Sequence, residues 1–179
     1  MTWGLRILQS IYTESKENKK RVMTKRIELT IIEENISAVA ELLEEEAPLT
    51  CTALWQALEI PIVHKGIHAM WTGCEIMVEI PSENYRFDPF AVPLENATIY
   101  PLPGDLMWAY FPDHVERGFP RAIWDFIIMY GPDSNVNCAL GTLPANVWAH
   151  ITENLPSFAS GCRSLLVEGM KTFRICRLE

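Results

Sequence analysis

The sequence lacks several features that mark specialised protein classes. No C-x-x-C pair occurs among its five cysteines, so neither a zinc ribbon nor a dithiol redox motif is indicated. No apolar run reaches the roughly 18 residues that a membrane span requires. The N-terminus has too short an apolar core for a signal peptide and lacks a small-residue cleavage site. These absences favour a cytoplasmic protein with reduced cysteines and no membrane partner.

Basic residues are also scarce. The chain has 15 Lys and Arg residues against 23 Asp and Glu residues, which gives a formal net charge of −8 at pH 7. A nucleic-acid partner would require a basic face, so none is expected. The short basic cluster, Lys16 to Arg26, falls mostly in a polar N-terminal stretch. We therefore predict an N-terminal extension over residues 1–22 and one domain over residues 23–179, a length that suits a single core.

Most of the chain after this extension has the character of β-strands. Alternating apolar residues, rich in β-branched types, are separated by connections too short for parallel crossovers, so antiparallel pairing is expected. The segment 122–130 is almost continuously apolar, which predicts a central strand buried on both faces. Strands are predicted at residues 26–32, 36–43, 61–71, 74–80, 97–100, 106–111, 122–130 and 172–178.

Three helices are predicted, over residues 47–58, 144–154 and 156–170. Each has a proline near its first turn, where the missing N–H has no intrahelical partner. In the first helix, an apolar stripe recurs at spacings of three and four residues. We expect the carboxylates of Glu44, Glu45 and Glu46 to lie at the positive end of its dipole.

Three motifs occur in a fixed order along the chain. They are Ala-Pro-Leu-Thr at residues 47–50, Gly-Ile-His-Ala-Met-Trp-Thr-Gly at residues 66–73, and Gly-Asp-Leu-Met-Trp at residues 104–108. Together they resemble an uncharacterised bacterial family of small cyclophilin-like proteins, over about residues 25 to 178. The resemblance implies a mainly β fold with helices. Its expected form is a closed or nearly closed antiparallel β-barrel of about eight strands, with helices packed at its ends.

The resemblance does not extend to the isomerase chemistry of cyclophilins. Cyclophilins use an arginine in a Phe-His-Arg step, and the matching residues here are Ile67, His68 and Ala69. Alanine has no side-chain donor, so the electrostatic contribution of that arginine is absent. We therefore expect no peptidyl-prolyl isomerase activity.

A pocket is predicted where the strands at 64–71, 74–80 and 106–111 meet, covered by the loop at 81–96. His68 is the candidate acid or base and Glu75 its partner carboxylate. Trp71 and Tyr110 are candidate ligand contacts, and Arg121 is a candidate partner for a ligand carboxylate. Structural alternatives stay open: the histidine can be hydrogen-bonded within the barrel, the aromatics can fill the core, and the arginine can form a surface ion pair.

A metal site is the other chemical possibility. His64 and His68 are four residues apart on one predicted strand, and Glu75 and Glu79 have the same spacing on the next. These groups could bind a metal. Histidines in small barrels are more often structural, so we predict neither a metal nor a cofactor.

The sequence favours a protein that binds a small molecule, and most concretely an enzyme acting on an amide or lactam. The alternative is a non-catalytic binding or assembly module, such as a partner subunit of an amidohydrolase system. Because six tryptophans and seven phenylalanines exceed what one small barrel interior needs, we also expect a homo-oligomer.

Overall fold

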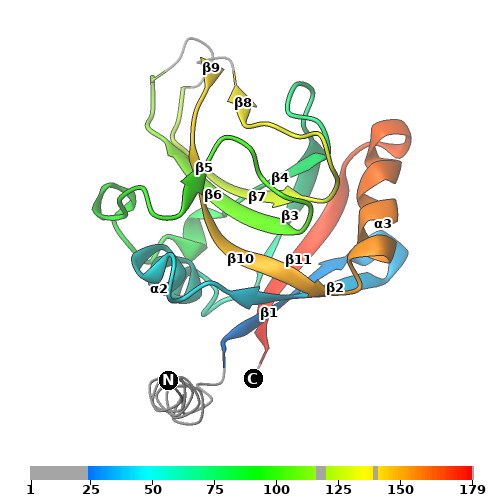
Figure 1. The fold of residues 1–179 in the computed structure, drawn as a ribbon, viewed down its shortest axis with the longest axis horizontal. Helices are drawn as coiled ribbons and strands as arrows, with labels where there is room; N and C mark the ends of the chain where they lie inside the picture. The colour runs from blue at the N-terminus through cyan, green and yellow to red at the C-terminus, as the bar shows by residue number, and fades with distance from the viewer. Residues whose placement is uncertain (1–23, 116–119, 139–140, 179) are drawn as a thin grey trace, which may run out of the picture.

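An antiparallel β-barrel forms the body of the protein in the computed structural model, which describes residues 24–115, 120–138 and 141–178 (Figure 1). Its strands are β1 (Arg26–Ile31), β2 (Ile36–Leu42), β3 (Ile62–His68), β4 (Glu75–Glu79), β5 (Ala97–Thr98), β6 (Asp105–Phe111), β7 (Ile123–Met129), β8 (Asn137–Cys138), β9 (Gly141–Thr142), β10 (Ala145–Glu153) and β11 (Lys171–Leu178).

Eight of these strands close the barrel in the order β2-β1-β11-β3-β4-β7-β6-β10, and a pairing between β2 and β10 joins the two ends. All of these pairings are antiparallel. The short β5 adds to β10, and β8 and β9 form a separate hairpin. The predicted closed, mainly β fold with helices is confirmed.

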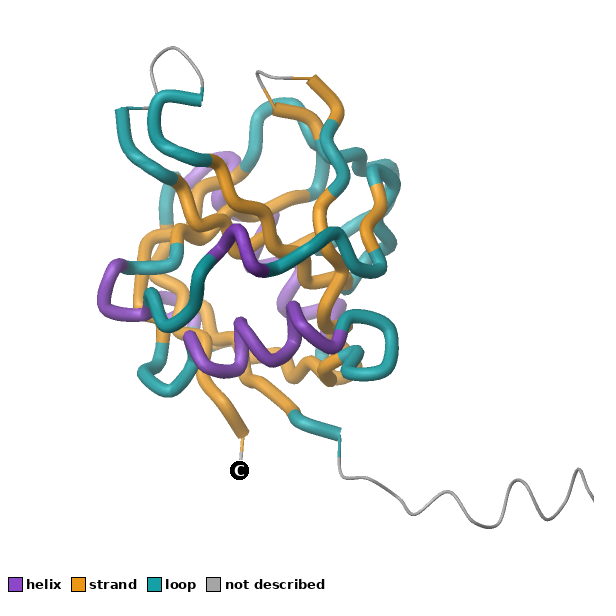
Figure 2. The backbone as a smooth tube through the Cα atoms, turned by 90° about the vertical axis from the view of Figure 1, so that its left-hand side faces the viewer, coloured by secondary structure: helices purple, strands orange, loops and turns teal. Residues whose placement is uncertain are grey.

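Two α-helices and three short 3₁₀ turns accompany the strands in the described residues. The helices are α2 (Pro48–Ala57) and α3 (Leu155–Glu168), and the turns are η1 (Ile32–Glu34), η2 (Ser82–Asn84) and η3 (Pro89–Ala91). Figure 1 places α2 and α3 on opposite sides of the barrel, and Figure 2 shows α2 and η3 in front of the strands when the molecule is turned. Neither helix is long and apolar enough to cross a membrane.

The barrel interior is filled by aromatic and branched side chains. Trp148 and Phe126 are fully buried and meet edge to face, with ring centroids 5.5 Å apart. Phe158 of α3 and Phe173 of β11 make a second such contact at 6.2 Å, which packs the helix against the barrel. These rings account for a large part of the apolar area that stabilises the fold.

A second, smaller apolar cluster lies on the other face of the barrel wall. It includes Met107 of β6, Ile127 and Met129 of β7, and Val147 of β10. Residues Phe126 and Ile128 of the same β7 strand point into the main core. Strand β7 is therefore buried on both faces, as its continuous apolar sequence predicts.

The predicted helix over residues 144–154 is wrong: this segment forms strand β10. Its middle residues pair with β2 on one side and β6 on the other, and most of the strand is buried. Val147, Trp148 and Ile151 suit a strand, and barrel closure supplies the pairing that local sequence does not reveal. The helix predicted at 156–170 is confirmed as α3, which is followed by Gly169 with a positive φ of 88°.

The expectation for the first helix also needs correction at its N-terminus. Helix α2 has no acidic residue in its first turn and no side-chain cap from Ala47. The carboxylate that accepts its free N–H groups belongs to Glu95, which lies 45 residues beyond Thr50. Glu44 instead pairs with Lys25 at 2.7 Å. Sequence proximity to a helix end does not determine which anion reaches it.

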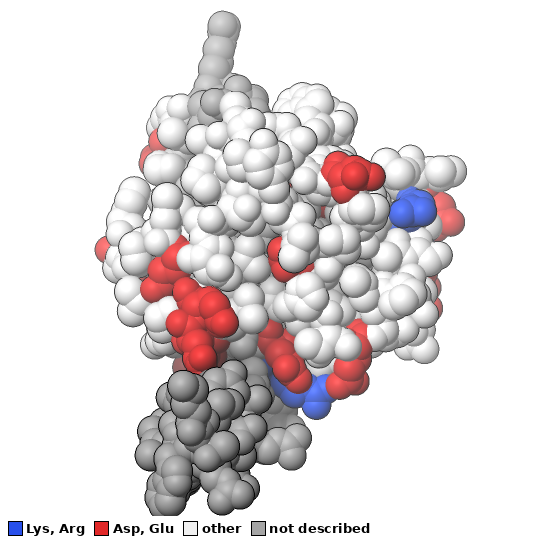
Figure 3. All heavy atoms as spheres, in the orientation of Figure 1, with Lys and Arg blue, Asp and Glu red and all other residues white. Residues whose placement is uncertain are grey.

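Charged side chains on the described surface agree with the negative net charge. Figure 3 shows more acidic than basic groups on the face drawn in the orientation of Figure 1. The predicted extension at residues 1–22 lies outside the described residues, so the domain boundary near residue 23 stays a prediction.

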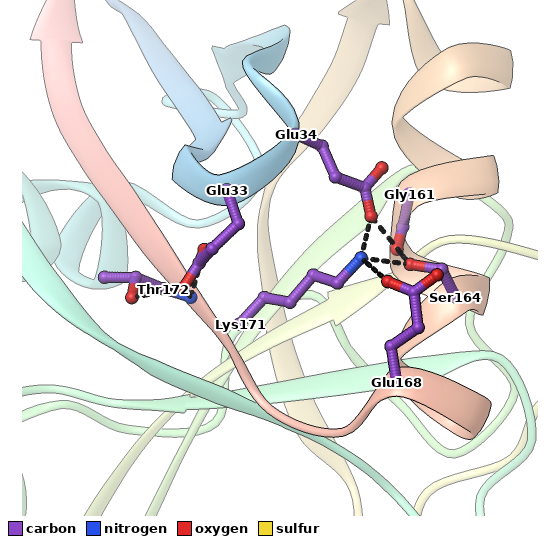
Figure 4. A network of polar contacts seen from close by, with 7 residues as sticks. All are labelled: Glu33, Glu34, Gly161, Ser164, Glu168, Lys171 and Thr172. Atoms are coloured by element: carbon purple, nitrogen blue, oxygen red, sulfur yellow. Dashed lines mark hydrogen bonds and ion pairs between the residues drawn. The ribbon is translucent and has the colours of Figure 1, made fainter.

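A polar network ties η1 to α3 and β11 (Figure 4). The Lys171 ammonium donates to Glu34 and to Ser164 and forms an ion pair with Glu168. Close by, the carboxylate of Glu33 accepts from the backbone N–H and the hydroxyl of Thr172. These contacts fix the turn between the first two strands to the C-terminal part of the chain.

We expect this network to make stability sensitive to acid. The hydrogen bond from Lys65, with those from Thr172, lowers the pKa of Glu33 to about 2, against an ordinary value of 4.5. The ionised carboxylate thus contributes stability above about pH 4.5 that is lost as pH falls towards 2. The thermal midpoint of Glu33→Gln should therefore be lower than that of the wild type at pH 6, with the gap closing by pH 2.5. Circular dichroism melts at the two pH values test this, and a constant gap would contradict it.

Candidate functional site

A cavity of about 760 Å³ lies against the barrel wall. Strands β3, β4, β6, β7 and the start of β10 line it, together with the 89–94 segment and residues near β8 and β9. Most of the lining side chains are apolar, and the volume is in the range of cavities that hold small organic ligands. The predicted pocket where β3, β4 and β6 gather, under the 81–96 loop, corresponds to this place.

The cavity floor is the outer face of the barrel wall. Residues paired directly across two antiparallel strands point to the same face. Glu75 is paired with Met129 and Met77 with Ile127, and both partners belong to the outer apolar cluster. Asp125 lies two residues before Ile127 on β7, so its side chain points to the same face of the barrel wall. The floor thus carries an acidic residue at each end and apolar side chains between them.

Glu75 is the first of these acids. Its side chain is only 2% exposed, and its Oε2 atom is buried without a hydrogen-bond partner. Burial raises the pKa of Glu75 to about 7, because desolvation disfavours the charged form, and the neighbouring Thr72 hydroxyl offsets only part of this rise. Near neutral pH, both the protonated and the ionised forms of this carboxyl group are populated.

Asp125 is the second acid, and the sequence analysis missed it. It is 6% exposed, and burial raises its pKa well above the ordinary value, with a smaller contribution from the negative charge of Glu75. A signal was present in the sequence: Asp125 is the one charged residue in the otherwise apolar 122–130 segment. A buried carboxyl in a central strand is costly, so its position indicates a functional site.

His68 also lines the cavity, but both of its ring nitrogens are engaged. Nδ1 lies 2.7 Å from the carbonyl oxygen of Ala69, and Nε2 lies 2.6 Å from the hydroxyl of Tyr130. A carbonyl can only accept, so Nδ1 donates to Ala69, and Nε2 is hydrogen-bonded to a hydroxyl that can donate or accept. His68 is paired with the inward-facing Ile76. The side chain of His68 therefore projects from the opposite face of the barrel wall to that of Glu75. These two described side chains form no hydrogen bond with each other.

The two predicted aromatic contacts lie in the cavity lining. Trp71 is 63% exposed, in the connection between β3 and β4. Tyr110 is half-buried and makes edge-to-face contacts with Phe90 and Trp124, at centroid distances of 5.2 and 5.6 Å. Together these rings make part of the cavity lining aromatic.

Arg121 lies outside the lining of the cavity. It is exposed and donates through both terminal nitrogens to the carboxylate of Glu79, which forms the surface ion pair that the sequence analysis held open as the alternative. Within the described ranges, no group of three or more potential ligands could hold a metal ion, including the histidines and glutamates of β3 and β4.

The loop at 81–96 is fixed by polar contacts to α2 and β10. The Asn146 side chain donates to the Thr50 hydroxyl at 2.9 Å and to the Pro93 carbonyl at 2.8 Å, and it accepts from the backbone N–H of Glu95 at 3.1 Å. Glu95 in turn accepts from the backbone and hydroxyl of Thr50. The Ala-Pro-Leu-Thr motif thus supplies the residue that positions one wall of the cavity.

The family model described as "Protein of unknown function (DUF3830)" matches residues 29–177. This chain belongs to that family. No curated protein matches the DUF3830 chain. The predicted membership in an uncharacterised family is confirmed, while its bacterial origin and its relationship to cyclophilins stay predictions.

A solved structure described as "Structure of McbB in complex with tryptophan" is similar to the DUF3830 chain. The TM-score is 0.57 at 19% sequence identity, and the match covers 84% of this chain and 44% of that chain. The DUF3830 chain thus spans less than half the length of McbB. At this identity the likeness shows a shared barrel-like fold.

We expect Glu75→Gln to stabilise the protein in a pH-dependent way. Because the pKa of Glu75 is raised in the folded state, its carboxyl lowers stability increasingly from about pH 4.5 to pH 7, and by a constant amount above that. The variant's advantage over the wild type in free energy of unfolding should be larger at pH 8 than at pH 4, by up to about 3 kcal/mol. Urea unfolding at the two pH values measures this difference. An equal change at both would show that Glu75 ionises normally.

We expect Thr50→Val to destabilise the protein by about 1–3 kcal/mol, because it removes one hydrogen-bond partner of the Glu95 carboxylate and one of the Asn146 side chain. Amide hydrogen exchange in residues 89–96 should accelerate as the loop loses its anchor. Thr52→Val is the matched control: it lies on the same helix, and its hydroxyl bonds only the Pro48 carbonyl. Equal effects of both variants on loop exchange would show that the loop does not depend on Thr50.

Proposed function

We propose that this protein binds a small molecule with an amide or lactam group in the cavity and acts on it, with Glu75 as general acid and base. The observation that carries the proposal is Glu75 itself: a carboxyl group buried in an apolar cavity, with one oxygen unpartnered and a pKa of about 7. A group that is partly protonated at the working pH can both give and take a proton.

The amide class is supported by hydrogen-bond complementarity. A protonated carboxyl group has one O–H donor and one carbonyl acceptor side by side. A lactam has the matching pair, a carbonyl acceptor beside an N–H donor. Such a ligand would provide Oε2 of Glu75 with the partner that it lacks in the described structure, and removing a buried unsatisfied group is worth about 1–3 kcal/mol.

His68 is the proposed second proton carrier. As a neutral ring it accepts from Tyr130, and a proton gained at Nε2 would reverse that hydrogen bond, so that Tyr130 becomes the acceptor. Burial raises the pKa of Tyr130 to about 12, so its hydroxyl keeps its proton and can either donate to His68 or accept from it. The pair is therefore suited to hold a proton on the His68 ring at one edge of the cavity.

The aromatic lining supports a small organic ligand. Trp71, Tyr110 and Phe90 give broad contact surfaces, and few polar groups compete with the ligand for contacts. A protein of similar fold has been solved in complex with tryptophan, itself a small aromatic molecule. That likeness agrees with the proposal but does not specify the ligand.

The second candidate function is a non-catalytic binding or assembly module, such as a partner subunit of an amidohydrolase system. Exposed apolar side chains at the cavity, including Met70, Phe90 and Leu94, favour it. Such a patch is typical of an interaction surface. The same surface supports the proposal that the protein self-associates as a homo-oligomer.

A panel of lactams, hydantoins and linear amides distinguishes the two functions. Calorimetry measures binding, and mass spectrometry of the incubated compounds measures turnover. We expect the wild type to bind and convert at least one compound. We expect Glu75→Gln, which keeps the shape and a hydrogen-bonding group, to bind it within several-fold and to lose at least about 100-fold in turnover.

Glu153→Gln is the control for this experiment. Glu153 lies at the end of β10, outside the cavity lining. It should retain both activities. Binding without turnover by the wild type would favour the module, and failure of every compound to bind would reject the amide proposal.

A further inference from the structure

The acid-base proposal uses Glu75 and leaves Asp125 unexplained. Asp125 lines the same cavity from β7 and is 6% exposed. No hydrogen bond or ion pair reaches its carboxyl group from the described residues, and burial is the main cause of its raised pKa. A buried acid that no protein group satisfies requires a proton, a ligand or water from the cavity to satisfy its oxygens.

The two acids lie at opposite ends of the cavity floor. On β4 and β7, Glu75 is paired with Met129 and Asp125 with Glu79, while Met77 and Ile127 form the pair between them. Four residues along a strand separate two positions by about 13 Å. A ligand that reaches both acids must therefore have two polar groups joined by an apolar body, which crosses Met77 and Ile127.

The charges at the cavity have one sign. No Lys or Arg lines the cavity within the described part of the chain, whereas Glu75 and Asp125 do. A ligand carboxylate would find no cationic partner there, and it would face two buried acids. A cationic group would satisfy the buried carboxyl, since opposite charges favour each other's ionised forms.

The volume and the lining distinguish an organic cation from an inorganic one. The described residues form no cluster that could hold a metal ion. The cavity of about 760 Å³ is lined by aromatic residues, among them Trp71, Tyr110 and Phe90. Aromatic faces attract organic cations by the cation–π interaction, and the apolar surface accommodates their carbon skeleton.

We propose that Asp125 is the binding residue for a protonated amino group, and that the natural ligand is an organic amine with an aromatic or apolar body. This inference rests on the proposed function, because the same cavity then places the reactive group of the ligand at Glu75. Ionised Asp125 donates no hydrogen bond and accepts from the ammonium N–H groups.

The groups around Asp125 determine the proton balance of binding. Glu79 is paired beside it on β4 and is held by Arg121, Ala109 is paired with it on β6, and Glu75 adds negative charge from the far end of the floor. Because burial favours the protonated form of Asp125, a bound ammonium should cause it to release its proton to solvent. Binding of an amine should therefore tighten as pH rises from 5 to 8.

Three probes of matched size test the proposal: phenethylamine, 2-phenylethanol and 3-phenylpropionate. Isothermal titration measures their affinities at pH 7.5, and repeating the amine titration in two buffers of different ionisation enthalpy measures proton release. We expect the amine to bind at least ten-fold tighter than the alcohol, the carboxylate to bind most weakly, and the amine to release protons.

Asp125→Asn should abolish the preference for the amine and its proton release while leaving affinity for the alcohol within about three-fold. Glu153→Gln makes the same change in net charge at the far end of β10, outside the cavity lining, and should leave the preference intact. The wild-type preference is itself a test that needs no variant, should Asp125→Asn fail to fold.

The possible results separate this inference from the proposed function. Equal affinity for the amine and the alcohol, or a preference for the carboxylate, overturns the role of Asp125 but leaves the lactam chemistry at Glu75 standing. Failure of all three probes to bind also overturns the organic-amine inference. An amine preference without turnover of any amide supports Asp125 and counts against the catalytic role of Glu75.

Discussion

Closure of the barrel by β10 is the constraint on which the rest of this structure depends. This strand pairs with β2 and β6 at once, and so turns an open sheet into a closed wall without free edges. Its residues then serve three regions: Trp148 fills the interior, Asn146 holds the cavity loop, and the strand leads directly into α3 at Asn154. Loss of β10 pairing would affect the core, the cavity and the helix together.

The cavity combines two opposing physical requirements. Apolar and aromatic side chains give a ligand most of its contact area, but burial among such side chains penalises the ionised forms of Glu75 and Asp125. A protein selected for stability alone would replace both carboxyls with apolar residues of similar size. Their presence on the outer face of β4 and β7, away from any arginine or lysine in the described lining, is therefore the strongest indication of function in the molecule.

Local patterns in the sequence predicted the barrel well. Alternation predicted β1, β2, β3, β4, β6 and β11, a continuous apolar run predicted β7, and the proline-led apolar stripe predicted α2. The pattern failed for β10, whose proline-led start resembles a helix and whose character depends on two partners distant in the sequence. It also failed for the anion at α2, because Glu95 arrives from a loop 45 residues beyond Thr50.

The sequence predicted which residues line the candidate cavity better than it predicted how their side chains are oriented. His68, Trp71, Glu75 and Tyr110 do line one cavity. Alternate residues of a strand point to opposite faces of the barrel wall, however, and the sequence did not reveal which face each side chain takes. The strand pairing places the ring of His68 and the carboxyl of Glu75 on opposite faces, and it places Asp125 on the same face as Glu75. Tyr130, which holds His68, could not be identified before the pairing of β4 with β7 was known.

The anchoring of the cavity loop at the N-terminus of α2 has a thermodynamic consequence. Thr50, Glu95 and Asn146 form one connected set, so the loop cannot leave the cavity without also breaking the helix cap. A ligand that holds the loop in place must therefore stabilise the ordered N-terminus of α2. By linkage, ordering of this helix end strengthens ligand binding by the same free energy. This reciprocity couples α2 energetically to a cavity whose lining does not include it.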